Sequence, residues 1–164
     1  MQSFELYNPV RVIFGVNESK NVAQHAKALG KKALIVSYED ISFLEGLLNN
    51  VKANLVENGI EVVEYFHVLA NPLICHIKEA VEICKNENID FCIGVGGGSV
   101  MDSTKVIAAG ALYDGDVWNM FVSRHDCIVS IPPEKSLPTI MIPTLPATSS
   151  EMNCIAVAAG KGEQ

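Results

Sequence analysis

The stretch Phe91-Cys-Ile-Gly-Val-Gly-Gly-Gly-Ser-Val-Met-Asp-Ser-Thr-Lys105 decides the fold. Residues 91–95 are a short apolar run, as expected of a strand that is buried on both faces. Three glycines follow at once, and the next segment is expected to be helical to about Tyr113. A buried strand that passes through a glycine turn directly into a helix is typical of a parallel sheet covered by helices.

Expected strands and helices alternate on both sides of this stretch. The expected strands are residues 11–14, 33–36, 60–66 and 139–142, and the expected helices are residues 17–29, 41–58 and 73–86. Asn17 is a plausible N-cap of the first helix, and Gly30 and Gly59 are typical of helix ends. The pattern predicts an α/β fold, a Rossmann-like parallel sheet with helices on both faces, in one domain over residues 1–164.

Composition and charge exclude several classes of function. The formal net charge is −7, and no cluster of Lys and Arg interrupts it, so a nucleic acid or an anionic membrane is not expected as a partner. Residues 1–14 do not resemble a signal peptide, and no apolar run is long enough to span a bilayer. Five scattered cysteines without a C-x-x-C pair are expected to be free thiols in a reducing cytoplasm.

The glycine turn has the context of a phosphate-binding site. Gly96, Gly97 and Gly98 would let the backbone approach a pyrophosphate, and the N–H groups and dipole at the helix start would face the anion. The Ser99 hydroxyl could add a donor or cap the helix. Because the motif is neither GxGxxG nor Walker A, a glycine-rich helix start without a ligand stays open. Asp102, one turn further on, suits capping as well as ligand contact.

A second segment, residues 143–153, is rich in hydroxyl groups and follows the expected strand 139–142. The carboxyl edge of a parallel sheet is where such folds bind ligands. The alternative is that Ser149 or Ser150 only starts a helix before Glu151.

Together these motifs resemble the iron-containing alcohol dehydrogenases. Residues 96–105 resemble the family's GGGSxxDxxK signature, and residues 143–153 resemble its second segment, with a Leu-Pro-Ala-Thr wording similar to the butanol dehydrogenase branch. Residues 4–15 are similar to the family's start, and Asn71-Pro72 stands where the family has Pro-Asn-Pro. The likeness covers the whole chain, although one motif alone would also fit glycerol dehydrogenases and dehydroquinate synthases. Ser149 departs from the pattern, which usually has Gly there.

The resemblance implies a set of contacts with a nicotinamide dinucleotide. It places the glycine turn and Ser99 at the pyrophosphate, Asp102 near the nicotinamide end and Asn71 on the adenosine side. It places three residues of the second segment along the cofactor cleft: Thr144, Leu145 and Thr148.

Residues 37–40 bear on the choice of cofactor. NADP-preferring members of the butanol dehydrogenase branch typically have a glycine-serine run there, whereas this chain has Glu39 and Asp40. Two carboxylates would repel a 2′-phosphate, and one could accept a hydrogen bond from a free ribose hydroxyl, so NAD is predicted over NADP. The alternative is that both carboxylates cap a helix that begins near Ile41.

The resemblance also implies what these residues lack. The family transfers a hydride between NAD(P)H and a primary alcohol or aldehyde with the help of a divalent metal, Fe or Zn. Its metal ligands and its all-helical C-terminal domain are expected to lie beyond residue 164, and none of His25, His67, His76 and His125 matches a ligand. We therefore expect no catalytic or metal-binding residue here and no turnover by these residues alone.

Two other roles remain open at this stage. The chain could be a stand-alone nucleotide-binding domain without catalysis, or an interaction module. In the family the first strand region resembles a dimer contact, so a homodimer through residues 4–14 is expected.

Overall fold

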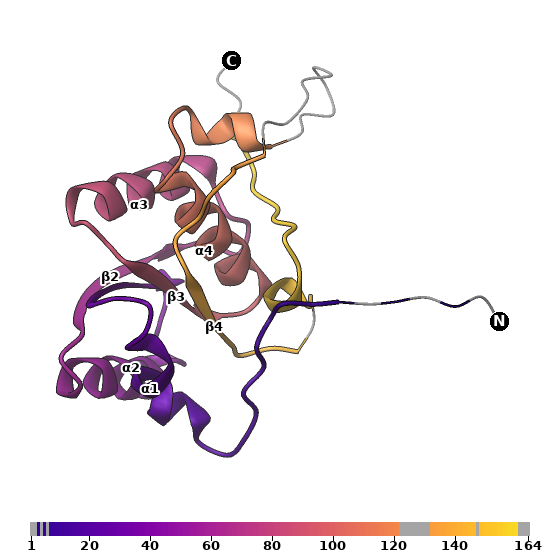
Figure 1. The fold of residues 1–164 in the computed structure, drawn as a ribbon. Coiled ribbons are helices and arrows are strands. Elements are labelled where there is room, and N and C mark those ends of the chain that lie inside the picture. Colours follow the sequence, from indigo (N-terminus) through magenta and orange to yellow (C-terminus); the bar gives the residue numbers. More distant parts are fainter. Residues whose placement is uncertain (1–2, 4, 6, 122–131, 147, 161–164) are drawn as a thin grey trace.

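The computed structural model describes residues 3, 5, 7–121, 132–146 and 148–160. Its four strands form one parallel sheet in the order β2-β1-β3-β4 (Figure 1). The strands are β1 (Lys32–Tyr38), β2 (Glu61–Val68), β3 (Phe91–Gly96) and β4 (Thr139–Pro143). The predicted parallel α/β sheet is confirmed.

Helices cover both faces of this sheet, as predicted. In Figure 1, α1 (Val22–Ala26) and α2 (Glu45–Glu57) lie on one side, and α3 (Ile74–Asn86) and α4 (Gly98–Gly110) lie on the other. Successive side chains of a strand point to opposite faces, so Ile35 packs with α1 and α2 whereas Leu34 packs with α3 and α4. There is one apolar core on each face of the sheet. Because the central strands bury side chains in both cores, they are continuous apolar runs.

The strand order reverses between β1 and β3. The chain leaves β1 through α2 to reach β2 at the edge, and it then returns through α3 to β3 on the other side of β1. The carboxyl ends of β1 and β3 therefore flank a topological switch point, the place where open α/β sheets bind ligands. The glycine turn follows β3 at this point.

The structure corrects the beginning of the chain. Residues 7–14 form no strand, so the prediction of a strand over residues 11–14 is wrong; Phe14 is 99% exposed and no described strand pairs with it. The predicted helix 17–29 is shorter and is divided into the 3-10 helix η1 (Glu18–Asn21) and α1. Asn17 has a left-handed backbone and makes no side-chain capping hydrogen bond, so it is not an N-cap in the expected way. Phe4 lies outside the described residues.

Two more helix starts differ from the prediction. The expected helix 41–58 begins only at Glu45, after a turn. The segment after Ser149 forms one 3-10 turn, η3 (Ser150–Met152), and Ser149 itself has a left-handed backbone without a capping hydrogen bond. That conformation favours Gly, and it explains why a glycine would suit this position.

The described cysteines are free thiols. Cys84 and Cys92 are buried beside one another, and Cys75 and Cys154 are exposed; Cys127 lies outside the described residues. A hydrogen bond with Cys84, together with burial, raises the pKa of Cys92, which keeps this thiol protonated. Within the described ranges, none of the helices has the length and apolar character needed to cross a membrane.

Candidate functional site

The glycine turn and the hydroxyl-rich segment lie side by side at the switch point. Gly97 is the N-cap of α4, directly after β3. The Thr144 N–H, just after β4, donates to the Gly96 carbonyl at 2.9 Å. The parallel pairing of β3 with β4 therefore brings the two motifs together, although about forty residues separate them in the sequence.

The space beside each glycine is filled by a side chain of the protein. A Cβ on Gly96 would lie 2.6 Å from Val100 Cγ2, and a Cβ on Gly97 would lie 2.8 Å from Tyr38 Oη. A Cβ on Gly98 would lie 2.6 Å from Thr148 Cγ2. Packing within the chain thus accounts for all three glycines, and a ligand is not needed to explain them.

Some hydrogen-bond donors of the glycine turn are bonded within the protein, and others lie at the start of α4 without a helical partner. The Gly97 N–H donates to Tyr38 Oη at 3.0 Å, and the Ser99 hydroxyl donates to the Ala70 carbonyl at 2.6 Å. The Met101 N–H is the first in α4 that bonds back along the helix, to the Gly97 carbonyl at 3.1 Å. The N–H groups of residues 98–100 precede it and have no partner within the helix, as at the start of any helix. These N–H groups can receive an anion.

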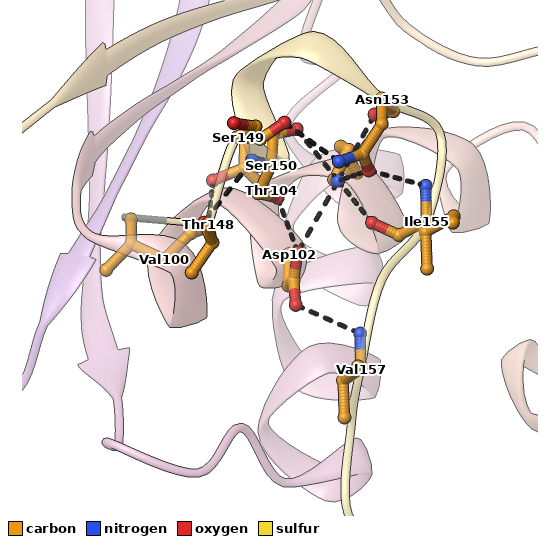
Figure 2. Close-up of polar contacts among 10 residues, drawn as sticks. Val100, Asp102, Thr104, Thr148, Ser149, Ser150, Asn153, Ile155 and Val157 are labelled. Atoms are coloured by element: carbon orange, nitrogen blue, oxygen red, sulfur yellow. Dashed lines mark hydrogen bonds and ion pairs between the residues drawn. The ribbon is translucent and has the colours of Figure 1, made fainter. Parts of the chain in front are cut away.

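Asp102 joins α4 to the hydroxyl-rich segment (Figure 2). Its Oδ1 accepts a hydrogen bond from the Ser150 hydroxyl, and its Oδ2 accepts one from the Val157 N–H at 3.0 Å. The Lys105 ammonium lies 3.4 Å from Oδ1. Asp102 is therefore held by contacts within the protein, and its position near a nicotinamide stays a prediction.

Lys105 completes this polar network. Its ammonium donates to the carbonyls of Ser150 at 2.9 Å, Asn153 at 3.2 Å and Ile155 (Figure 2). Burial lowers the pKa of Lys105, and the neighbouring Asp102 carboxylate opposes part of that shift. We call Asp102, Lys105 and Ser150 the α4 clamp, because together they fix the second motif against α4.

The two carboxylates after β1 have different surroundings. Asp40 accepts the Ser42 N–H at 3.0 Å, and hydrogen bonds from Ser42 lower the pKa of Asp40. Asp40 therefore caps the turn that precedes α2, but not α2 itself, which begins at Glu45. Glu39 pairs through its backbone with the Val68 carbonyl at 3.2 Å, and its side chain is exposed at the carboxyl end of β1.

The remaining predicted contacts surround the same edge of the sheet. Asn71 is exposed next to Ala70, the residue that accepts the Ser99 hydroxyl. Leu145 is exposed beside Gly97, and Thr148 lies against Gly98. The structure therefore gathers most of the predicted site residues at one place: Gly96, Gly97, Gly98, Ser99, Asp102, Thr144, Leu145 and Thr148.

Tyr38 is the site residue that the sequence analysis missed. It ends β1, and its phenol contacts the glycine turn. The available signal was an aromatic residue at the last position of a central strand, but the run 37–40 was interpreted only by its charge.

The described residues contain no group of three or more His, Cys, Asp and Glu that could hold a metal ion. His76 lies close to His67, whose backbone carbonyl is 3.0 Å from His76 Nδ1, and His25 is on α1. His125 lies outside the described residues.

Comparisons with known proteins place these observations in a family context. The sequence matches the family described as iron-containing alcohol dehydrogenase over residues 9–164. It is 41% identical over 153 residues to "Probable NADH-dependent butanol dehydrogenase 1" of Bacillus subtilis (strain 168), an alignment that covers 93% of this chain and 38% of that protein. It is 30% identical over 164 residues to an NADPH-dependent aldehyde reductase of Escherichia coli (strain K12), with 98% and 40% covered.

A solved structure agrees with the sequence matches. The crystal structure of NADH-dependent butanol dehydrogenase A from Thermotoga maritima superposes with a TM-score of 0.86 at 37% identity, and the match covers 98% of this chain and 39% of that one. The chain thus spans about two fifths of the length of these relatives.

Proposed function

Because the chain belongs to the iron-containing alcohol dehydrogenase family, we propose that residues 1–164 form its nicotinamide-dinucleotide-binding domain. When bound, the cofactor would supply a hydride donor or acceptor for interconversion of a primary alcohol and an aldehyde in the complete enzyme. The part of this chain is to bind and orient that cofactor. The proposal extends to a reducing, cytoplasmic setting, which suits the four described free thiols.

The observation that carries the proposal is the start of α4 at the switch point. The N–H groups of residues 98–100 start α4 directly after β3, which lies between β1 and β4, and a diphosphate there would meet the helix dipole and donors without a helical partner. The absence of a Cβ at Gly97 and Gly98 makes room for Tyr38 and Thr148, whose side chains form the walls beside these N–H groups. Thr144 and Thr148 contribute hydroxyl groups along the same edge.

NAD is the proposed cofactor in preference to NADP. The exposed Glu39 carboxylate follows β1, at the position from which an acidic residue can hydrogen-bond a ribose hydroxyl. A 2′-phosphate at the same place would meet its negative charge. Asp40 contributes less, because Ser42 already engages its carboxylate. The name of the Bacillus subtilis relative, "Probable NADH-dependent butanol dehydrogenase 1", supports the same choice.

We derive no catalytic step from the described residues. They offer no metal-binding group, so the Fe or Zn of the complete family enzyme would not be held by them. We propose that the chain by itself binds cofactor but does not oxidise alcohols, and metal-dependent turnover by the purified 164 residues would contradict this.

The experiment is a fluorescence titration of the purified chain with NADH and, in parallel, with NADPH. We expect saturable binding of NADH and weaker binding of NADPH. Equal binding of both would contradict the role of Glu39 and leave the domain assignment in place. Failure to bind either nucleotide would contradict the assignment itself.

The second candidate role is self-association. It is favoured by one observation, the exposure of apolar side chains between Tyr7 and Val16. We propose that two copies associate through this segment, and binding of cofactor does not exclude this.

A further inference from the structure

Tyr38 is the last residue of β1, and its side chain lies against the glycine turn. Its ring lies so close to the turn that a Cβ on Gly96 would be 3.1 Å from Tyr38 Cε2. On the other side the ring contacts Phe43, with 6.0 Å between the ring centroids. The phenol is therefore held over the turn by the strand that carries it and by an aromatic neighbour.

The phenol occupies a donor that a diphosphate would use. Gly97 is the N-cap of α4, and its single N–H donates to Tyr38 Oη at 3.0 Å, within the normal range for such a bond. A phosphate oxygen cannot accept this hydrogen bond at full strength while the phenol oxygen accepts it. The Ser99 hydroxyl is also engaged, by Ala70. Two of the predicted pyrophosphate contacts are thus satisfied within the chain.

Tyr38 differs from the other side chains that cover the turn. Leu145 and Thr148 belong to an exposed segment after β4, and neither accepts a hydrogen bond from the turn's N–H groups among the contacts of the described residues. Tyr38 belongs to a central strand and takes a hydrogen bond from the turn itself. Its hydroxyl is the group that competes chemically with an anion.

We propose that Tyr38 lowers the dinucleotide affinity of this chain by occupying a donor of the glycine turn. Its hydroxyl accepts the Gly97 N–H in the free protein and is displaced from it when a diphosphate binds. The inference rests on the proposed function. It assigns a role in cofactor binding to Tyr38. The ring can stay beside the glycine turn when a diphosphate binds, but the hydroxyl competes with the diphosphate for the Gly97 N–H.

The test is Tyr38→Phe in the full chain, with Tyr113→Phe as the matched control because Tyr113 lies just beyond the far end of α4. The phenylalanine keeps the ring contacts and removes the phenol oxygen that accepts the Gly97 N–H, so this internal hydrogen bond is not lost on binding. We expect NADH to bind about five-fold more tightly to Tyr38→Phe, the effect of one neutral hydrogen bond. Tyr113→Phe should bind as wild type does.

Two further measurements locate the effect. ADP-ribose, which contains the diphosphate, should gain the same factor as NADH, whereas adenosine should gain nothing. The amide resonance of Gly97 in a ¹H–¹⁵N spectrum of the free protein should shift in Tyr38→Phe and stay in place in Tyr113→Phe. The spectrum needs no ligand and also shows whether each variant is folded.

The outcomes separate this inference from the proposed function. Binding of NADH by all three proteins with equal or weaker affinity for Tyr38→Phe would overturn the inference alone. An unchanged Gly97 resonance would also overturn it, because the hydrogen bond would then be absent in solution. If no protein bound NADH or ADP-ribose, the proposed function would fail and the inference with it.

Discussion

Thr148 occupies the space that a Cβ on Gly98 would need. A Cβ there would lie 2.6 Å from Thr148 Cγ2 and 2.8 Å from its Oγ1, so Gly98→Ala must displace the segment after β4. The segment is exposed at this point, and we expect the free energy of unfolding to fall by only about 1 kcal/mol. NADH binding should weaken at least about ten-fold, a change of roughly 1.4 kcal/mol in binding free energy, because the displaced wall belongs to the site.

The matched control for this substitution is Gly46→Ala. Gly46 lies in α2, and nothing would contact its Cβ within 4 Å. Alanine should stabilise the helix by about 0.5–1 kcal/mol and leave NADH binding unchanged. Urea unfolding measures the change in stability of both variants, and NADH titration measures the change in their affinity. Wild-type affinity in Gly98→Ala would show that the nucleotide does not reach α4.

Glu39 and Asp40 carry the same charge, which allows a direct test of the cofactor preference. We expect Glu39→Gln to raise the affinity for NADPH relative to NADH about ten-fold at low ionic strength, because it removes a negative charge from the surroundings of the 2′-phosphate. Asp40→Asn should have a smaller effect, since the Asp40 carboxylate is directed to Ser42. Fluorescence titrations at low and high salt measure both, and the effect should shrink as salt screens it. A larger effect of Asp40→Asn would contradict the assignment to Glu39.

The sequence predicted the glycine turn and its neighbours but not the role of Tyr38. Gly97, Gly98 and Ser99 follow one another in a recognisable pattern, so local chemistry was enough to find them. The hydrogen bond from Gly97 to Tyr38 spans 59 residues and depends on the pairing of β1 with β3. Nothing in the local sequence specifies such a contact. The hydrogen bond from the Ser150 hydroxyl to Asp102 could not be predicted either, because it also joins segments that are far apart in the sequence.

At the scale of elements, prediction succeeded where the burial pattern is regular, either on both faces of a strand or on one face of a helix. β1 and β3 are continuous apolar runs, and α3 was predicted to within one residue of its bounds. Prediction failed for residues 11–14, which are as apolar as a strand but have no partner strand in the single chain. Apolar sequence favours a strand only if a sheet is there to receive it.

The α4 clamp can be tested by removing the Lys105 ammonium. Lys105→Met would leave the carbonyls of Ser150, Asn153 and Ile155 without their shared donor and would remove the positive charge beside Asp102. Since the side chain is only 16% exposed, we expect a loss of about 1–3 kcal/mol in the free energy of unfolding. Amide exchange of residues 150–157 should accelerate, while that of β1 and β3 should change little.

Lys52→Met is the control for the removal of a lysine from an ion pair. Lys52 and Glu64 are 2.9 Å apart, but both side chains are more than a third exposed. Such a pair contributes about 0.2–1 kcal/mol. A similar stability loss in the two variants would show that the network around Lys105 has no special structural role.

At the scale of the whole molecule, the sequence predicted the layers of the fold because each layer has a local signature. The alternation of strands and helices implies a parallel sheet with two covered faces, and both cores are present. Where the two motifs meet depends in addition on the strand order β2-β1-β3-β4, which places β4 next to β3. No local pattern encodes that order, so the shared site followed from position at the carboxyl edge and from family resemblance.

The segment from Tyr7 to Val16 bears on assembly. Tyr7, Val12, Phe14 and Val16 are 64–99% exposed, although the Asn8 side chain fixes the segment to the Met152 carbonyl at 3.0 Å. Water contact with so many apolar side chains is unfavourable, and a second copy of the chain could cover them through a symmetric contact. Because residues 7–14 form no strand in the single chain, any strand pairing would have to form on association.

Phe14→Lys tests this contact at its most exposed residue. In a symmetric dimer the change occurs twice, and each buried phenylalanine contributes about 1.5–3 kcal/mol, so the dimer dissociation constant should rise at least about 100-fold. Sedimentation equilibrium should show a wild-type dimer and a monomeric variant. Val56→Lys, at a 54% exposed position of α2, should remain dimeric. A wild-type chain that is monomeric at every concentration would remove this segment from the account of assembly, and it would leave the cofactor site intact because no residue of that site belongs to the segment.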